Sequence, residues 1–135
     1  MMPKKILIVE DDESLLKFES ILLSTKGYLV YGAMTGVAAL SDIAEDHPDL
    51  IILDITLPGL DGFEVCRRIK GNPETRHIPV LFLSGKTTPA DILCGNLAGA
   101  DQYITKPFKS AKVLAAIKLL LEKEESHSGK QGMLH

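Results

Sequence analysis

Long apolar runs are missing from this sequence of 135 residues, and so is tryptophan. A membrane-spanning helix needs about 20 consecutive apolar residues, and no segment approaches that length. The first apolar run, at residues 6–9, is followed at once by three acidic residues, so it is too short for the apolar part of a signal peptide. We therefore expect a cytoplasmic protein that is not associated with a membrane.

Cysteine is scarce as well. The two cysteines, Cys66 and Cys94, both fall within predicted helices. We interpret them as small buried apolar residues of a protein in a reducing compartment, which argues against a disulfide framework. The four histidines show no spacing that is typical of metal ligands, so the sequence predicts no metal site built on histidine.

Neither sign of charge is in large excess. Fifteen lysine and arginine residues against 18 aspartate and glutamate residues give a formal net charge of -3. Domains that bind nucleic acid usually carry a basic surface, so we predict no direct binding of nucleic acid by this chain. The apolar content of 45% and the length are ordinary for one globular domain with its own core.

Short apolar runs alternate with segments in which apolar residues recur every three or four positions. The first pattern predicts buried strands, and the second predicts one face of a helix. Predicted strands lie at residues 5–9, 28–32, 50–54, 80–83 and 101–105. Predicted helices lie at residues 12–25, 36–46, 61–70, 88–98 and 110–124. Strict alternation predicts an α/β protein with a doubly wound parallel sheet of five strands, covered by helices on both faces.

Two parts of this pattern are expected to be weak. Gly95 lies in the middle of the fourth predicted helix, where glycine costs about 1 kcal/mol relative to alanine, so we expect this helix to be the least stable. Residues 125–135 are mostly polar and lack helical periodicity. We therefore expect a folded domain at residues 1–124 and a disordered polar tail at residues 125–135.

Asp54 stands at the end of the third predicted strand, directly after the apolar run at residues 50–53. A Pro-Gly pair and an Asp-Gly pair follow at residues 58–62, and both are typical of turns. Taken alone, Asp54 is explained most simply as the cap of a turn or of the next helix. Ligands in open α/β sheets also bind at the carboxyl ends of strands, so the other strand ends decide between the two interpretations.

Charged and hydroxyl side chains gather at this same predicted edge of the sheet. They are Glu10, Asp11, Asp12, Asp54, Ser84 and Lys106. Carboxylates this close together require a cation, and oxygen ligands favour Mg²⁺ or Mn²⁺. A carboxylate can also act as a nucleophile, and phosphoryl transfer needs mainly positioning and neutralisation of charge. The sequence therefore predicts a metal-assisted phosphoryl-transfer site at this edge.

Three segments and one single residue, taken in order, make the sequence resemble the receiver domain of two-component response regulators. They are ILIVEDDE at residues 6–13, LDITLPGLDGFEVCRRIK at 53–70, Ser84, and AGADQYITKPF at 98–108. The resemblance covers about residues 4–124. It implies a flavodoxin-like fold with the strand order 2-1-3-4-5. It also implies a phosphoacceptor signalling domain without a turnover substrate, rather than an enzyme.

The resemblance assigns the central chemistry to a few residues. It implies that Asp54 accepts a phosphoryl group from the phosphohistidine of a histidine kinase or of a histidine phosphotransfer domain. It implies that Mg²⁺, or Mn²⁺ in its place, is held by Asp11, Asp12, Asp54 and the backbone carbonyl of Thr56.

The resemblance also assigns roles near the last two strands. It implies that Lys106 contacts the phosphoryl group, that the peptide bond before Pro107 is cis, and that Ser84 and Tyr103 are the switch residues. As Ser84 moves toward the phosphoryl group, Tyr103 is expected to turn inward and to reshape the face made by the fourth helix and the fifth strand. This face is the expected partner surface, including that of a homodimer.

Three other interpretations use the same kind of strand end. A flavodoxin-like electron carrier would need a hydroxyl- and glycine-rich phosphate loop after the first strand, where this chain has three acids. A phosphatase of the haloacid dehalogenase class normally has a second aspartate two residues after the first, where this chain has Thr56. A receiver-like interaction module that phosphorylation does not regulate is the remaining alternative. Such a module would be expected to have lost Asp54 or Lys106, and both are present.

Overall fold

The structure is a computed structural model that describes the backbone of residues 2–133 and the side chains of residues 2–123. Strands and helices alternate along this part of the chain, as predicted. The strands are β1 (Lys5–Val9), β2 (Leu29–Ala33), β3 (Leu50–Leu53), β4 (Val80–Ser84) and β5 (Gln102–Thr105). The helices are α1 (Glu13–Ser24), α2 (Gly36–Glu45), α3 (Gly62–Gly71), α4 (Pro89–Leu97) and α5 (Ser110–Met133).

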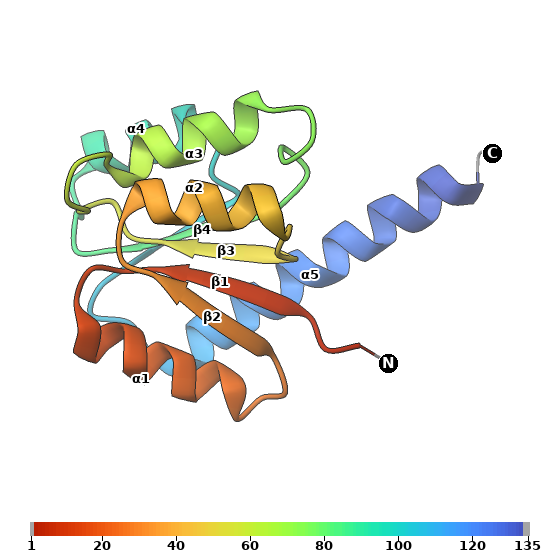
Figure 1. The fold of residues 1–135 in the computed structure, drawn as a ribbon, viewed down its shortest axis with the longest axis horizontal. Coiled ribbons are helices and arrows are strands. Elements are labelled where there is room, and N and C mark those ends of the chain that lie inside the picture. Colours follow the sequence, from red (N-terminus) through yellow and green to blue (C-terminus); the bar gives the residue numbers. More distant parts are fainter. Residues whose placement is uncertain (1, 134–135) are drawn as a thin grey trace.

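All the strand pairs are parallel, and together they form a five-stranded sheet in the order β2-β1-β3-β4-β5. Helices α2, α3 and α4 lie on one side of the sheet, and α1 and α5 lie on the other (Figure 1). The doubly wound fold and the strand order are therefore confirmed. Because the strands are parallel, they all end at the same edge, which places the residues that follow them close together.

The three central strands read as unbroken apolar runs because both of their faces are buried. Successive side chains of a strand point to opposite faces, so each strand supplies two separate clusters. The cluster toward α2 and α3 includes Leu7, Val9, Ile51, Leu53 and Phe82. The cluster toward α1 and α5 includes Ile6, Ile8, Ile52, Leu81 and Leu83. This double burial fixes β3 in the middle of the sheet, and therefore also fixes the position of Asp54 after it.

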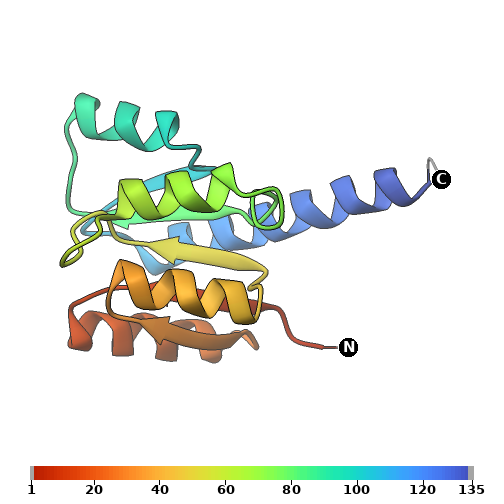
Figure 2. The same cartoon turned by 45° about the horizontal axis from the view of Figure 1, so that its top comes forward.

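The last helix is longer than expected, since α5 ends at Met133 rather than near residue 124. Glutamate and lysine at residues 122–125 are good helix formers, and no glycine or proline interrupts residues 110–128. In Figures 1 and 2 the end of α5 projects beyond the sheet. The predicted disorder of residues 125–135 stays a prediction, since the side chains from residue 124 onward and the backbone of residues 134–135 lie outside the described part of the chain.

The two cysteines differ in exposure, and one prediction about them is wrong. Cys66 is buried as expected, and burial raises the pKa of its thiol to about 11. Cys94 is exposed. The buried residue of α4 is its neighbour Gly95, which faces the sheet in its place. In the described residues we find no helix with both the length and the apolar character that a membrane span requires.

Candidate functional site

The candidate site lies at the edge where β1, β3, β4 and β5 end. Glu10 follows β1 and Asp54 follows β3, while Ser84 is the last residue of β4 and Lys106 follows β5. Backbone hydrogen bonds join the ends of neighbouring strands. The Asp54 N–H donates to the Val9 carbonyl at 3.0 Å, and the Lys106 N–H donates to the Ser84 carbonyl at 2.8 Å. The convergence predicted from the sequence is therefore present.

Lys106 connects the two buried carboxylates of the site. Its Nζ lies 2.7 Å from Glu10 Oε1 and 3.1 Å from Asp54 Oδ2. The side chains of Glu10 and Asp54 are only 4% and 10% exposed. Burial raises the pKa of Glu10, although the hydrogen bond from Lys106 opposes this rise. Burial also disfavours charged Lys106, but its bond to Glu10 and the charge of Asp54 outweigh this and raise the pKa of Lys106.

A group of carboxylates that could hold a metal ion is present, and it includes Glu10, which was not among the predicted ligands. Ligand atoms of Glu10, Asp11 and Asp54 all lie within 4.8 Å of one another. Three carboxylates facing the one ammonium of Lys106 leave an excess of negative charge, which suits a divalent cation with oxygen ligands. These residues fit Mg²⁺.

Asp12, which we expected among the ligands, lies outside this group and is the N-cap of α1; its part in holding the metal stays a prediction. Its Oδ1 accepts the Leu15 N–H at 3.1 Å, and its backbone is extended, with φ of -82° and ψ of 109°. Glu10 belongs to the group, and Glu10 Oε2 accepts the Asp12 N–H at 3.1 Å. Aspartate is strongly preferred at the N-cap position of a helix, and this preference could have indicated that Asp12 caps α1.

The backbone around Asp54 depends on close packing of the next helix. The Thr56 N–H donates to Asp54 Oδ1 at 3.2 Å, and the Gly62 N–H donates to the Ile55 carbonyl at 2.9 Å. A Cβ atom at Gly62 would overlap the backbone carbonyl of Asp54 and lie 2.7 Å from Ile55 Cα. The first residue of α3 therefore has to be glycine for the loop that follows Asp54 to keep its course.

The substitution Gly62→Ala should lower the free energy of unfolding by about 2 kcal/mol. The added methyl group would meet backbone atoms, which cannot move aside as a flexible side chain could. Gly71→Ala is the matched control, since Gly71 ends the same helix and a Cβ atom there meets open space. Urea denaturation of both variants measures the difference. Equal effects of the two substitutions would contradict the packing argument.

Ser84 and Tyr103, the predicted switch residues, are linked through the backbone of Lys86. The Lys86 N–H donates to Ser84 Oγ at 3.3 Å, and the Tyr103 hydroxyl donates to the Lys86 carbonyl at 2.6 Å. Ser84 is fully buried and Tyr103 is half-buried, and burial raises the pKa of the Tyr103 hydroxyl. The peptide bond between Lys106 and Pro107 is cis, the isomer that the resemblance implies.

Sequence reasoning missed a buried carboxylate behind the site. Glu19 on α1 is 4% exposed, and its Oε2 has no hydrogen-bond partner among the described residues. Burial, and next the charge of Glu10, raise the pKa of Glu19 to about 7. The signal was helical spacing: Glu19 lies three residues after Leu16 and four before Leu23, which are both on the inner face of α1.

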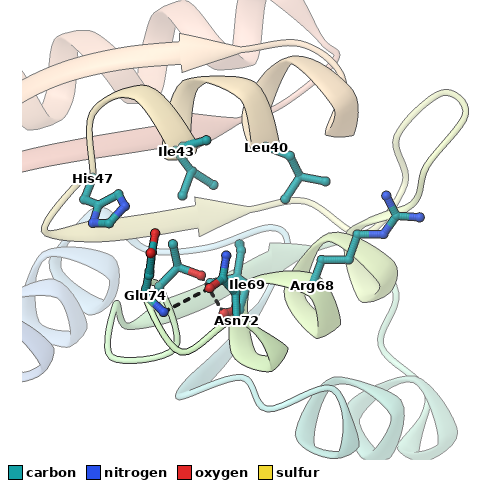
Figure 3. Close-up of a pocket in the computed structure, with 9 residues that line it drawn as sticks. Leu40, Ile43, His47, Arg68, Ile69, Asn72 and Glu74 are labelled. Atoms are coloured by element: carbon teal, nitrogen blue, oxygen red, sulfur yellow. Dashed lines mark hydrogen bonds between the residues drawn. The ribbon is translucent and has the colours of Figure 1, made fainter.

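A surface pocket of about 230 Å³ lies elsewhere, between α2 and the end of α3 (Figure 3). Leu40, Ile43 and Ile69 belong to its apolar part, and His47 and Glu74 lie around it. None of the acidic-site residues lines this pocket. The residues for which the sequence predicts chemistry therefore lie at the strand ends and not in the pocket.

The sequence matches known proteins over most of its length. A family model described as "Response regulator receiver domain" matches residues 6–118. The response regulator PleD of Caulobacter vibrioides is 39% identical over 119 residues, which are 88% of this chain and 26% of PleD. Protein PilG of Pseudomonas aeruginosa is 39% identical over 114 residues, which are 84% of each chain. This chain thus spans about a quarter of PleD and most of PilG.

A solved structure resembles the fold of this chain. The receiver domain of a sensor histidine kinase from Pseudomonas aeruginosa matches with a TM-score of 0.83 and 27% identity, over 90% of this chain and 99% of that one. That structure has a magnesium ion coordinated in its active-site cleft. The family match, the strand order and the acidic group at the strand ends agree, and the chain belongs to the response regulator receiver domain family.

Proposed function

We propose that this chain is a phosphoacceptor, in which Asp54 takes a phosphoryl group from the phosphohistidine of a histidine kinase or of a histidine phosphotransfer domain. The observation that carries this proposal is the placement of Asp54. It directly follows the central strand β3, contacts Lys106 at 3.1 Å, and belongs to the carboxylate group with Glu10 and Asp11. A carboxylate that only capped a turn would not require a half-buried ammonium and two further acids beside it.

In the proposed transfer, an Asp54 carboxylate oxygen attacks the phosphorus atom while the bond from phosphorus to the imidazole nitrogen breaks. The leaving nitrogen keeps the bonding electron pair, and the product is an acyl phosphate on Asp54. Lys106 would neutralise charge on the phosphoryl oxygens, and the Thr56 N–H and the Ser84 hydroxyl would donate hydrogen bonds. Mg²⁺, held by Glu10, Asp11 and Asp54, would supply further neutralisation; the part of the Thr56 carbonyl in holding it stays a prediction.

The proposed output is a change in the face formed by α4 and β5. Movement of the Ser84 hydroxyl toward the phosphoryl group would pull on Lys86, and therefore on the hydroxyl of Tyr103. Phosphorylation needs only to bias an existing equilibrium between two positions of these residues. We propose that this face binds partners, a second copy of the chain among them.

Intact-mass measurement after incubation with acetyl phosphate and Mg²⁺ tests the phosphoacceptor. The wild type should gain one phosphoryl group, and Asp54→Asn should gain none. Asp11→Asn should lose most of the incorporation, because it removes a carboxylate of the metal-binding group. Asp12→Asn is the matched control: asparagine is also a good N-cap, so this variant should still be phosphorylated. Incorporation into Asp54→Asn would refute the assignment.

A further inference from the structure

Gly95 on α4 lies directly against the ring of Tyr103 on β5. A Cβ atom at Gly95 would lie 2.9 Å from Tyr103 Cδ2 and 3.1 Å from Tyr103 Cε2. It would also lie 3.4 Å from Phe82 Cδ2, an ordinary contact. The Tyr103 ring therefore occupies the space that any side chain at position 95 would need.

Backbone geometry does not explain this glycine. The glycines with positive φ are Gly27, Gly59 and Gly99, so the conformation of Gly95 is open to other residues. Glycine is nevertheless among the worst residues for a helix interior. Its presence as the buried residue of α4 is explained by the room that it leaves.

Tyr103 cannot easily move out of this space, because it is held at both ends. Its hydroxyl donates to the Lys86 carbonyl at 2.6 Å. Its ring packs on Phe82, with 5.8 Å between the centroids, and Phe82 in turn packs edge-on against Phe63 at 5.7 Å. Displacement of the Tyr103 ring by a side chain at position 95 would therefore be opposed by both the hydroxyl contact and the aromatic packing.

We propose that Gly95 is a positioning residue that seats the ring of Tyr103 under α4, so that the position of the helix and the position of the ring depend on each other. With a side chain at position 95, either α4 would have to move away from the sheet or the Tyr103 hydroxyl would have to leave the Lys86 carbonyl. The consequence for signalling rests on the proposed function: a movement of Ser84 and Lys86 that displaces Tyr103 also changes where α4 can lie. The steric contact itself exists without phosphorylation.

NMR of the full, unphosphorylated chain tests the contact. In the wild type, nuclear Overhauser effects should connect the ring protons of Tyr103 to the Hα protons of Gly95 and to the ring of Phe82. Gly95→Ala should abolish the contacts between Tyr103 and Phe82 and shift the Tyr103 ring signals. Gly71→Ala, in which a helical glycine with open space around it is changed, should leave them intact. Unchanged Tyr103 contacts in Gly95→Ala would overturn the proposal.

A second comparison separates the steric effect of the Tyr103 ring from the effect of alanine on the stability of α4. Gly95→Ala should lower Tm in the wild-type background but raise it when combined with Tyr103→Ala, because alanine then improves the helix without meeting a ring. If Gly95→Ala alone does not fold, the double variant must still fold with a Tm at least equal to that of Tyr103→Ala. Equal losses in both backgrounds, or failure of both variants to fold, would overturn the proposal.

The proposed function can fail separately. Gly95→Ala should gain a phosphoryl group from acetyl phosphate as the wild type does, while the shifts of α4 amide signals on phosphorylation should be reduced. Normal α4 shifts in this variant would overturn the signalling part of the inference. Absence of phosphorylation in the wild type would refute the proposed function instead, and the result on the contact between Gly95 and Tyr103 would stand.

Discussion

Lys106→Met should lower the free energy of unfolding by about 3 kcal/mol at pH 7 in the absence of divalent cations. The ammonium of Lys106 is the partner of both Glu10 and Asp54, whose side chains are 4% and 10% exposed. Removing one member of a buried charge pair leaves an uncompensated charge, which typically costs about 3–5 kcal/mol. Here the lower end applies, because two carboxylates share one ammonium and repel each other in the wild type as well.

Urea denaturation with and without Mg²⁺ measures this effect. Mg²⁺ should stabilise Lys106→Met more than the wild type, because the cation supplies the positive charge that the variant lacks. Lys112→Met is the control, since Lys112 is exposed on α5 and its loss should change stability by less than about 0.5 kcal/mol. A Lys106→Met variant as stable as Lys112→Met would show that the carboxylates do not depend on this ammonium.

Glu19→Gln should change how stability depends on pH. The pKa of Glu19 is raised from 4.5 to about 7 in the folded protein, mainly by burial. The folded state therefore holds this proton more tightly than the unfolded state does. The resulting stabilisation is fully present below about pH 4.5 and is lost as the pH rises through about 7. At 1.36 kcal/mol for each pH unit, the loss in the wild type is about 3 kcal/mol.

Glutamine cannot ionise, so the free energy of unfolding of Glu19→Gln should gain about 3 kcal/mol relative to the wild type between pH 4.5 and pH 8. The slope is the informative quantity, because any constant cost of burying the amide cancels from it. Denaturation curves at several pH values for wild type, Glu19→Gln and the exposed-site control Glu74→Gln provide the measurement. Parallel pH profiles for wild type and Glu19→Gln would refute the prediction.

The strands and their common edge could be predicted because strands with two buried faces need apolar residues at every position. An unbroken apolar run such as residues 50–53 is stable only with both faces covered. Once β3 is central and its neighbours are parallel, Asp54 and Lys106 have to approach one another. The alternation of strands and helices predicted the layers, and the resemblance to receiver domains added the strand order.

What sequence reasoning could not resolve was decided by local geometry within a few residues. Glu10 and Asp12 are both acids beside β1, and only the backbone angles at the start of α1 assign one to the acidic group and the other to the cap. Cys94 and Gly95 are neighbours on α4, and a rotation of one residue decides which is buried. Composition and periodicity do not resolve differences of a single position.

The backbone of Lys86 connects the end of β4 with Tyr103, and this has an evolutionary consequence. Its N–H and its carbonyl make the two contacts, and every residue type except proline offers both groups. The side chain at this position can therefore diverge among descendants without uncoupling the two hydroxyls. Substitution at this position can therefore change the charge near the end of β4 without breaking either backbone contact.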